Sequence, residues 1–250
     1  MKKILVPTLI AAAIGSLASV AHAAEPESTL AFNAGVVSDY RYRGISQSRL
    51  EPALQGGVDY TDKSGFYVGA WGSTIKWIKD AGASQGSFEL DLYGGYKGAV
   101  GDVSYDVGFL RYEYVGNKLA NVSGSVNANT NEVYGAVTYG LFTAKYSHSL
   151  SDVFGNPNTK NSYYLDLSAN FDLGDGYTLT PHVGRQSFKN NSQISYNDYS
   201  LTLAKDLGNG LAVTGALVDT NADKSQAVYK TPAGKFTGKS GVVVGLKYSF

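Results

Sequence analysis

The sequence predicts an all-β fold, a transmembrane antiparallel β-barrel of about twelve strands with short turns at one end and long loops at the other. Three observations support this prediction: apolar and polar residues alternate along many short segments, short and long connections alternate, and the composition is 43% hydrophobic but only 17% charged. A soluble domain carries about 25% charged residues. The hydrophobic residues are dispersed, so strands rather than long apolar helices are expected to cross the membrane.

The last predicted strand shows the alternation most clearly. One face is apolar and carries Val242, Val244, Leu246, Tyr248 and Phe250. The other face is mostly small or polar and carries Val243, Gly245, Lys247 and Ser249. This two-residue period is typical of a barrel strand with lipid outside and water inside. Twelve such segments begin near Thr29, Pro52, Phe66, Ser87, Val103, Asn131, Leu141, Asn161, Tyr177, Tyr196, Leu211 and Ser240.

The connections between these segments alternate in length. The short ones are residues 62–65, 98–102, 139–140, 173–176 and 207–210. The long ones are residues 39–51, 74–86, 116–130, 151–160 and 221–239, and residues 189–195 are intermediate in length. Outer-membrane barrels have short periplasmic turns and long outer loops. The pattern therefore predicts that both ends of the barrel domain lie on the periplasmic side.

The first 23 residues have the features of a cleaved signal peptide. Lys2 and Lys3 precede an uncharged, mostly apolar stretch, and Ala21-His22-Ala23 is a small-x-small cleavage site. A membrane anchor is the alternative, although Pro7 and the short length disfavour it. We expect residues 1–23 to be removed and residues 24–250 to form one barrel domain in the outer membrane of a Gram-negative bacterium.

Charge and cysteine content exclude some classes of function. The formal net charge is 0, and it becomes −2 once Lys2 and Lys3 are removed. This balance does not fit a nucleic-acid-binding protein, which has a basic surface. The chain has no cysteine, so no disulfide can stabilise it. The strand ladder and side-chain packing must do so.

Two segments resemble a known family. Residues 38–48 (SDYRYRGISQS) and 52–60 (PALQGGVDY) resemble the opening of the TorF-type porin family of Gram-negative bacteria. The C-terminal segment 246–250 (LKYSF) is similar to the terminal strands that barrel-assembly machinery recognises through a final aromatic residue, here Phe250. The resemblance implies an outer-membrane barrel with a channel role, but it implies no particular substrate.

Side-chain alternation indicates which charged residues face the barrel interior. These pore-lining candidates are Asp59, Glu89, Asp91, Lys97, Asp106, Lys145, Asp166, Asp198 and Lys247. Rings of charged side chains set ion selectivity, so the acidic excess predicts a weak cation preference. Alternatively, Asp–Lys pairs close the lumen and no ions pass. Inward-facing glycines favour some open volume, whereas the loop 221–239 is long enough to fold inward.

Arg41 and Arg43 are candidates for a loop or interface role. They either bind lipopolysaccharide phosphates or line the pore mouth, or they pair with loop carboxylates while the neighbouring tyrosines anchor the interface. Tyrosines at strand ends are expected to lie where lipid meets water. This expectation covers Tyr60, Tyr96, Tyr139, Tyr177 and Tyr248 at the turn side and Tyr112, Tyr114, Tyr146 and Tyr163 at the loop side.

Enzymatic function is disfavoured. Only His148 and His182 follow the signal peptide, and no nucleophile motif surrounds either. No segment has zinc-ligand or EF-hand spacing, so no metal or other cofactor is expected. The sequence predicts a porin-like channel for ions or small polar solutes, in contact with outer-membrane lipid and lipopolysaccharide. The alternative is a non-conducting barrel that acts through its outer loops.

Overall fold

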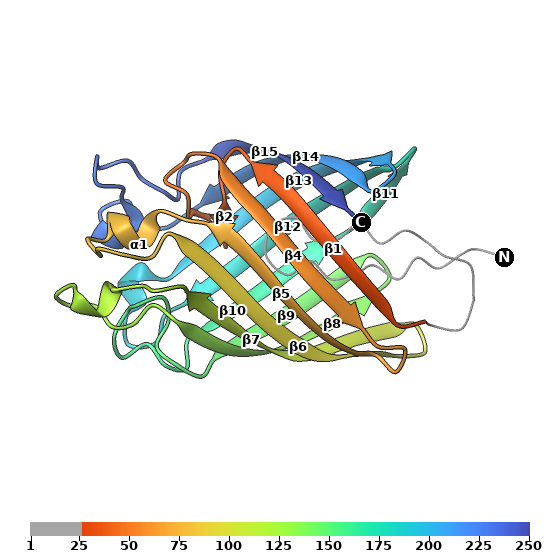
Figure 1. Ribbon diagram of the computed structural model, residues 1–250, viewed down its shortest axis with the longest axis horizontal. Coiled ribbons are helices and arrows are strands. Elements are labelled where there is room, and N and C mark those ends of the chain that lie inside the picture. The colour runs from red at the N-terminus through yellow and green to blue at the C-terminus, as the bar shows by residue number, and fades with distance from the viewer. Residues whose placement is uncertain (1–26) are drawn as a thin grey trace.

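Twelve antiparallel strands close into one barrel in a computed structural model that describes residues 27–250 (Figure 1). The predicted signal peptide lies outside these described residues. The barrel strands are β1 (Thr29–Val37), β4 (Ala53–Thr61), β5 (Phe66–Thr74), β6 (Phe88–Val100), β7 (Val103–Tyr114), β8 (Thr130–Tyr139), β9 (Phe142–Ser149), β10 (Tyr163–Ala169) with its continuation β11 (Phe171–Gly174), β12 (Tyr177–Ser187), β13 (Tyr196–Gly208), β14 (Leu211–Thr220) and β15 (Gly241–Ser249). The predicted fold class is confirmed.

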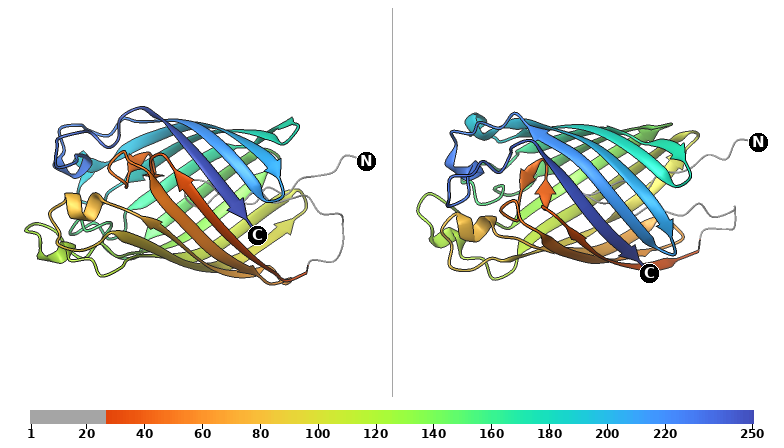
Figure 2. Two further views of the ribbon diagram at one scale, coloured as in Figure 1. Left: turned by 45° about the horizontal axis from the view of Figure 1, so that its top comes forward. Right: turned by 90° about the horizontal axis from the view of Figure 1, so that it is seen from above.

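Each barrel strand pairs with its neighbours in the sequence, and the pairing of the first strand with the last closes the wall. β1 pairs with both β4 and β15, while β10 pairs with both β9 and β12. Figure 2 shows the strands side by side from two further directions. Closure matters because an open sheet edge would expose unpaired backbone groups to lipid.

The two ends of the barrel differ as the connection lengths predict. Tight turns gather at one end, which we call the turn end, and the long connections at the other, the loop end (Figure 1). At the turn end, Asp175-Gly176 and Asn209-Gly210 have positive φ angles at both residues. This conformation is that of the type I′ turns that join twisted antiparallel strands.

Short elements occupy the loop end. They are β2 (Arg41–Tyr42), β3 (Ile45–Ser46), α1 (Trp77–Asp80) and three 3-10 helices, Leu119–Asn121, Ser192–Ile194 and Ala227–Tyr229. Loop side chains pack against one another there, and Ile78, Ala128 and Val153 are completely buried. Within residues 27–250, no helix is long and apolar enough to span a membrane.

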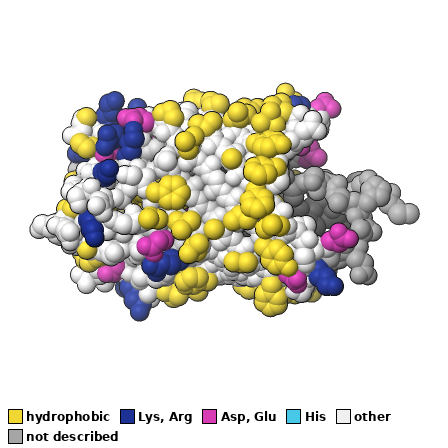
Figure 3. Space-filling view, viewed as in Figure 1, with side chains coloured by type: hydrophobic (Ala, Val, Ile, Leu, Met, Phe, Trp, Pro, Cys, Tyr) yellow, Lys and Arg dark blue, Asp and Glu magenta, His cyan; other side chains and the backbone are white. Residues whose placement is uncertain are grey.

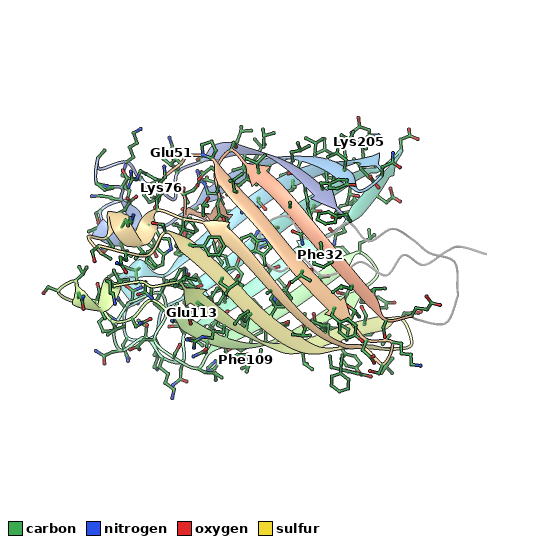
Figure 4. All side chains as sticks on the ribbon, in the orientation of Figure 1. Phe32, Glu51, Lys76, Phe109, Glu113 and Lys205 are labelled. Carbon is green, nitrogen blue, oxygen red and sulfur yellow. The ribbon has the colours of Figure 1, made fainter. Side chains whose placement is uncertain are left out.

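The outer wall is apolar between its two ends. Figure 3 shows charged side chains gathered toward the ends and hydrophobic or uncharged ones across the middle. Phe32 and Phe109 project from this wall, whereas Glu51 and Lys76 lie at the loop end (Figure 4). The apolar face predicted for the last strand is exposed along its whole length, from Val242 to Phe250. The wall therefore suits a lipid surrounding.

The strand-end tyrosines divide into two groups. Tyr60, Tyr139, Tyr177 and Tyr248 are exposed on the outer wall near the turn end, as predicted. The prediction is wrong for two loop-side residues, because Tyr112 and Tyr114 are only 1% and 2% exposed. They lie on the inner face of β7, on the same side as Asp106 and Gly108, since residues two apart share a face.

Candidate channel interior

The first long loop folds back into the barrel as a small hairpin. β2 and β3 pair through Arg41–Ser46 and Tyr42–Ile45, and a two-residue turn joins them. Both turn residues have positive φ angles, 47° at Arg43 and 78° at Gly44. Gly44 also lies against the barrel wall, where an added Cβ would come within 2.5 Å of Thr220 Cγ2. The backbone conformation and this close approach together require glycine.

Arg43, at the tip of the hairpin, binds the barrel wall across the interior. Its guanidinium donates to both carboxylate oxygens of Glu132, at 3.1 and 2.7 Å, and to Gln186 Oε1 at 2.6 Å. The guanidinium also stacks over the Tyr164 ring, 4.2 Å from its centroid. The Arg43 and Glu132 side chains are 6% and 2% exposed. A bidentate, buried contact of this kind fixes orientation strongly.

The base of the hairpin is held by Asp39 and by the last long loop. Asp39 accepts hydrogen bonds from Arg41 Nε and Ser46 Oγ, each at 2.5 Å. Arg41 also donates to the backbone oxygens of Thr237 and Lys239 at 3.0 Å. Arg41 thus pairs with a loop carboxylate, one of the two predicted alternatives. Arg43 pairs with Glu132 on a barrel strand instead.

The inward-folding loop is not the one that length suggests. The β2–β3 hairpin of the loop 39–51 enters the barrel, whereas the longer loop 221–239 packs over the hairpin through the backbone oxygen of Thr237. The tight turn at Arg43-Gly44 makes the first loop compact enough to enter. The expectation that residues 221–239 fold inward is therefore wrong, because the hairpin of the loop 39–51 occupies the interior instead.

All nine charged candidates lie on the inner face, alternating with exposed apolar residues along their strands. They are Asp59, Glu89, Asp91, Lys97, Asp106, Lys145, Asp166, Asp198 and Lys247. Whether they line a conducting pore stays a prediction. Glu89, Asp91, Asp106 and Asp198 are at most 5% exposed, so these four carboxylates are shielded from bulk solvent.

Tyrosines, rather than lysines, bind most of the interior carboxylates. Tyr93 donates to Asp59 at 2.5 Å, Tyr67 to Asp106 at 2.6 Å, and Tyr164 to both oxygens of Asp198 at 3.1 Å. Among residues 27–250, no Asp–Lys ion pair forms in the interior. The predicted Asp–Lys pairs are therefore wrong, because the tyrosine hydroxyls occupy the carboxylates.

The interior lysines contact aromatic rings. Lys97 Nζ lies 4.5 Å from the centroid of the Tyr67 ring, and Lys145 Nζ lies 4.0 Å from that of Tyr134. The Tyr67 and Tyr134 hydroxyls also hydrogen-bond each other. The electron-rich faces of these rings attract the ammonium groups in place of a carboxylate.

The inward glycines accommodate these tyrosines. A Cβ at Gly95, Gly108 or Gly184 would come within 2.6 Å of a Tyr67, Tyr134 or Tyr164 side-chain atom, respectively. The prediction that these glycines leave open volume is therefore wrong, because tyrosine side chains from neighbouring strands occupy the space. Glycine here permits a large side chain on the next strand to lie flat across the wall.

Several interior residues are absent from the sequence-based candidates. Glu132, Gln186 and the tyrosines of the inner face belong to this group. The signal for Glu132 was present, because it alternates with Val133 and Val137 on the outer face of β8. The same alternation also predicts that Gln186 and Tyr164 face the interior. It does not predict that these residues converge on Arg43, because that contact joins residues up to 143 positions apart.

The two described histidines show no arrangement typical of a hydrolase. His182 Nε2 contacts Asp166 Oδ2 at 3.0 Å and the Tyr164 hydroxyl at 3.1 Å. His148 contacts the Tyr146 hydroxyl and Asn161. Neither histidine has a serine among these partners. Within the described part of the chain, no group of three His, Cys, Asp or Glu side chains could hold a metal ion.

The twelve-stranded barrel is similar in fold to porins of known structure. The KdgM porin superposes with a TM-score of 0.53 at 10% identity, covering 89% of this chain and 99% of that one. The NanC porin also gives 0.53, at 11% identity and the same coverage. A KdgM porin structure in complex with disordered oligogalacturonate gives 0.51 at 9% identity. At such identities, the likeness establishes the fold.

A family model identifies the chain more closely. Residues 21–250 match a bacterial protein family of unknown function, Gcw_chp, and the chain belongs to that family. No curated protein matches it. These matches do not name a TorF-type porin, so that resemblance stays a prediction.

Proposed function

We propose that this protein is a porin-like outer-membrane channel for ions or small polar solutes, narrowed by the β2–β3 hairpin. The observation that carries the proposal is a closed twelve-stranded barrel with charged side chains along its inner face. Barrels of eight strands have packed interiors and those of sixteen or more hold aqueous channels, so twelve strands suit a narrow passage. The wall then lies in lipid, the turn end faces the periplasm and the loop end faces outward.

The interior charge supports passage of cations. With Glu132, the inner face carries seven carboxylates, of which six were predicted. The interior holds four basic side chains, so the acidic groups exceed the basic ones by three. The basic residues are Arg43, Lys97, Lys145 and Lys247. An acidic lining raises the local concentration of cations and repels anions. Oligogalacturonate, which appears with one similar porin, is a polyanion. The lining of this barrel disfavours such a solute, and we propose cations or neutral solutes instead.

Planar-bilayer recording tests the proposal directly. The folded protein should give discrete current steps, with a reversal potential under a salt gradient that indicates cation preference. Arg43→Ala should increase the conductance severalfold, because the hairpin tip then loses Glu132 and Gln186. Lys79→Ala, which changes a loop cation outside the interior, is the matched control. Silence from both wild-type and Arg43→Ala barrels that are inserted and folded would contradict the channel.

A second candidate is a non-conducting barrel that acts through its outer loops. The observation that favours it is the tight filling around Arg43, where Glu132 is 2% exposed. In that case no single change in the hairpin would produce current. Removal of the exposed loop segments would instead abolish binding of a surface partner while leaving the barrel folded. No enzymatic step forms part of either proposal.

A further inference from the structure

Two carboxylates on β6, Glu89 and Asp91, differ from the other interior carboxylates because each has a buried oxygen without a hydrogen-bond partner. Among residues 27–250, no side chain forms an ion pair or hydrogen bond with Asp91, and its buried Oδ1 is unpartnered. Glu89 accepts one hydrogen bond, from the Tyr40 hydroxyl at 3.1 Å, and its buried Oε2 is unpartnered. Glu89 is only 1% exposed and Asp91 only 4% exposed.

Two ionised carboxylates placed in this way are electrostatically unfavourable unless a proton or another positive charge joins them. Burying one ionised carboxylate without a partner costs several kcal/mol. Residues two apart on one strand lie about 7 Å apart, since each residue adds about 3.3 Å, so their charges also repel. Arg43 does not neutralise them directly, because its guanidinium is engaged by Glu132 and Gln186. A cation from solution would supply the missing charge.

The surroundings indicate which kind of cation fits. Strand pairing places Trp71 and Tyr112 beside Asp91, and Tyr114 beside Glu89. Aromatic faces attract cations, most strongly those that are weakly hydrated. Two carboxylates fall short of the six to eight oxygens that Ca²⁺ takes. The site therefore suits a monovalent cation rather than a divalent metal ion.

We propose that Glu89 and Asp91 form a binding subsite, beneath the hairpin, for an ammonium-type cation: ammonium itself or the primary amine of a small solute. The N–H groups of such a cation can donate to the two unpartnered oxygens, Glu89 Oε2 and Asp91 Oδ1. Its charge offsets theirs, and its remaining surface contacts the aromatic rings. This inference rests on the proposed channel function, because it names the class of solute that the channel would hold.

Thermal unfolding of the detergent-folded protein tests binding without requiring current. The midpoint is measured in chloride salts of ammonium, methylammonium, potassium and tetraethylammonium at equal ionic strength. A ligand that binds only the folded state raises the midpoint. Ammonium and methylammonium should raise it above the value in tetraethylammonium. Equal midpoints in all four salts would overturn the site, and an equal rise in potassium would overturn the assignment to ammonium-type cations.

Matched variants locate the effect. Glu89→Gln/Asp91→Asn should remove the ammonium-dependent rise. Asp59→Asn should keep it, because Tyr93 already hydrogen-bonds the Asp59 carboxylate. If the double variant does not fold, Asp91→Asn alone replaces it. A rise that persists without these carboxylates would overturn the proposal.

Bilayer recording separates failure of the site from failure of the channel. Asp91→Asn should lower the permeability of methylammonium relative to potassium, and Asp59→Asn should not. A silent barrel that still shows the ammonium-dependent rise would contradict the channel alone. A conducting barrel without that rise would contradict the subsite alone.

Discussion

The loop-end and turn-end halves of the barrel interior are built from the same alternation of residues but are filled differently. At the loop end, the β2–β3 hairpin enters, and Glu89, Asp91 and Glu132 are at most 4% exposed. Toward the turn end, Asp59, Lys97 and Lys247 stay partly exposed, with only wall side chains around them. The comparison shows that an inserted segment fills the loop-end half of the interior, whereas wall side chains alone fill the turn-end half.

Removing the hairpin should abolish this difference and have the largest effect. When Gly-Gly replaces residues 40–47, the barrel should still fold, because the strand ladder does not include them. The bilayer conductance should rise severalfold over that of wild type. Deleting residues 232–234, an exposed tip of the loop that covers the hairpin, is the control and should leave conductance near the wild-type value. Unchanged conductance without the hairpin would show that the wall tyrosines close the lumen.

Crowding the wall interior should lower stability. A Cβ at Gly95 would come within 2.3 Å of Val107 O and 2.6 Å of the Tyr67 hydroxyl. Overpacking of this kind costs about 1–3 kcal/mol, so Gly95→Ala should lower the free energy of unfolding in urea by that amount. Gly215→Ala is the matched control, because nothing lies within 4 Å of its added Cβ. Equal stability of both variants would mean that the tyrosines can move aside.

Weakening the contact at the hairpin tip should have a smaller effect on current. Glu132→Gln removes the charge that pairs with Arg43 but keeps side-chain size and one acceptor oxygen. The hairpin should then leave the interior more often, and the conductance should show brief openings to a higher level. Single-channel recording at fixed voltage measures their frequency. Asp166→Asn is the control for loss of an interior negative charge, and equal frequencies in both variants would contradict a specific role of Glu132.

The smallest expected effect concerns the loop surface. The hydrogen bond from Lys76 lowers the pKa of Glu51 below its usual 4.5, and both side chains are exposed loop residues. A lowered pKa in the folded state stabilises the fold above the unfolded-state pKa, and this stability is lost as pH falls through the folded-state pKa. Glu51→Gln should therefore slightly lower the thermal midpoint at pH 7 and lower it less at pH 3. An equal decrease at both values would contradict this origin.

The sequence by itself determined the strands, their faces and the two unlike ends of the barrel. These features are local, because a two-residue period and a turn such as Asn209-Gly210 need only neighbouring residues. The same period placed Asp91, Asp106 and Lys145 on the inner face, and it could have placed Glu132 and Tyr112 there too. The number of strands could also be predicted from the sequence, because every predicted segment forms a strand that pairs with its neighbours along the chain.

Only the tertiary structure decided what fills the interior. The contact of Arg43 with Glu132 and Gln186 joins segments far apart in sequence, and no local pattern encodes it. The tyrosines that bind Asp59 and Asp106 come from strands other than their own, so their partners depend on register and barrel closure. Local periodicity fixes which way a side chain points, whereas the group that it meets depends on how the closed barrel brings distant strands together.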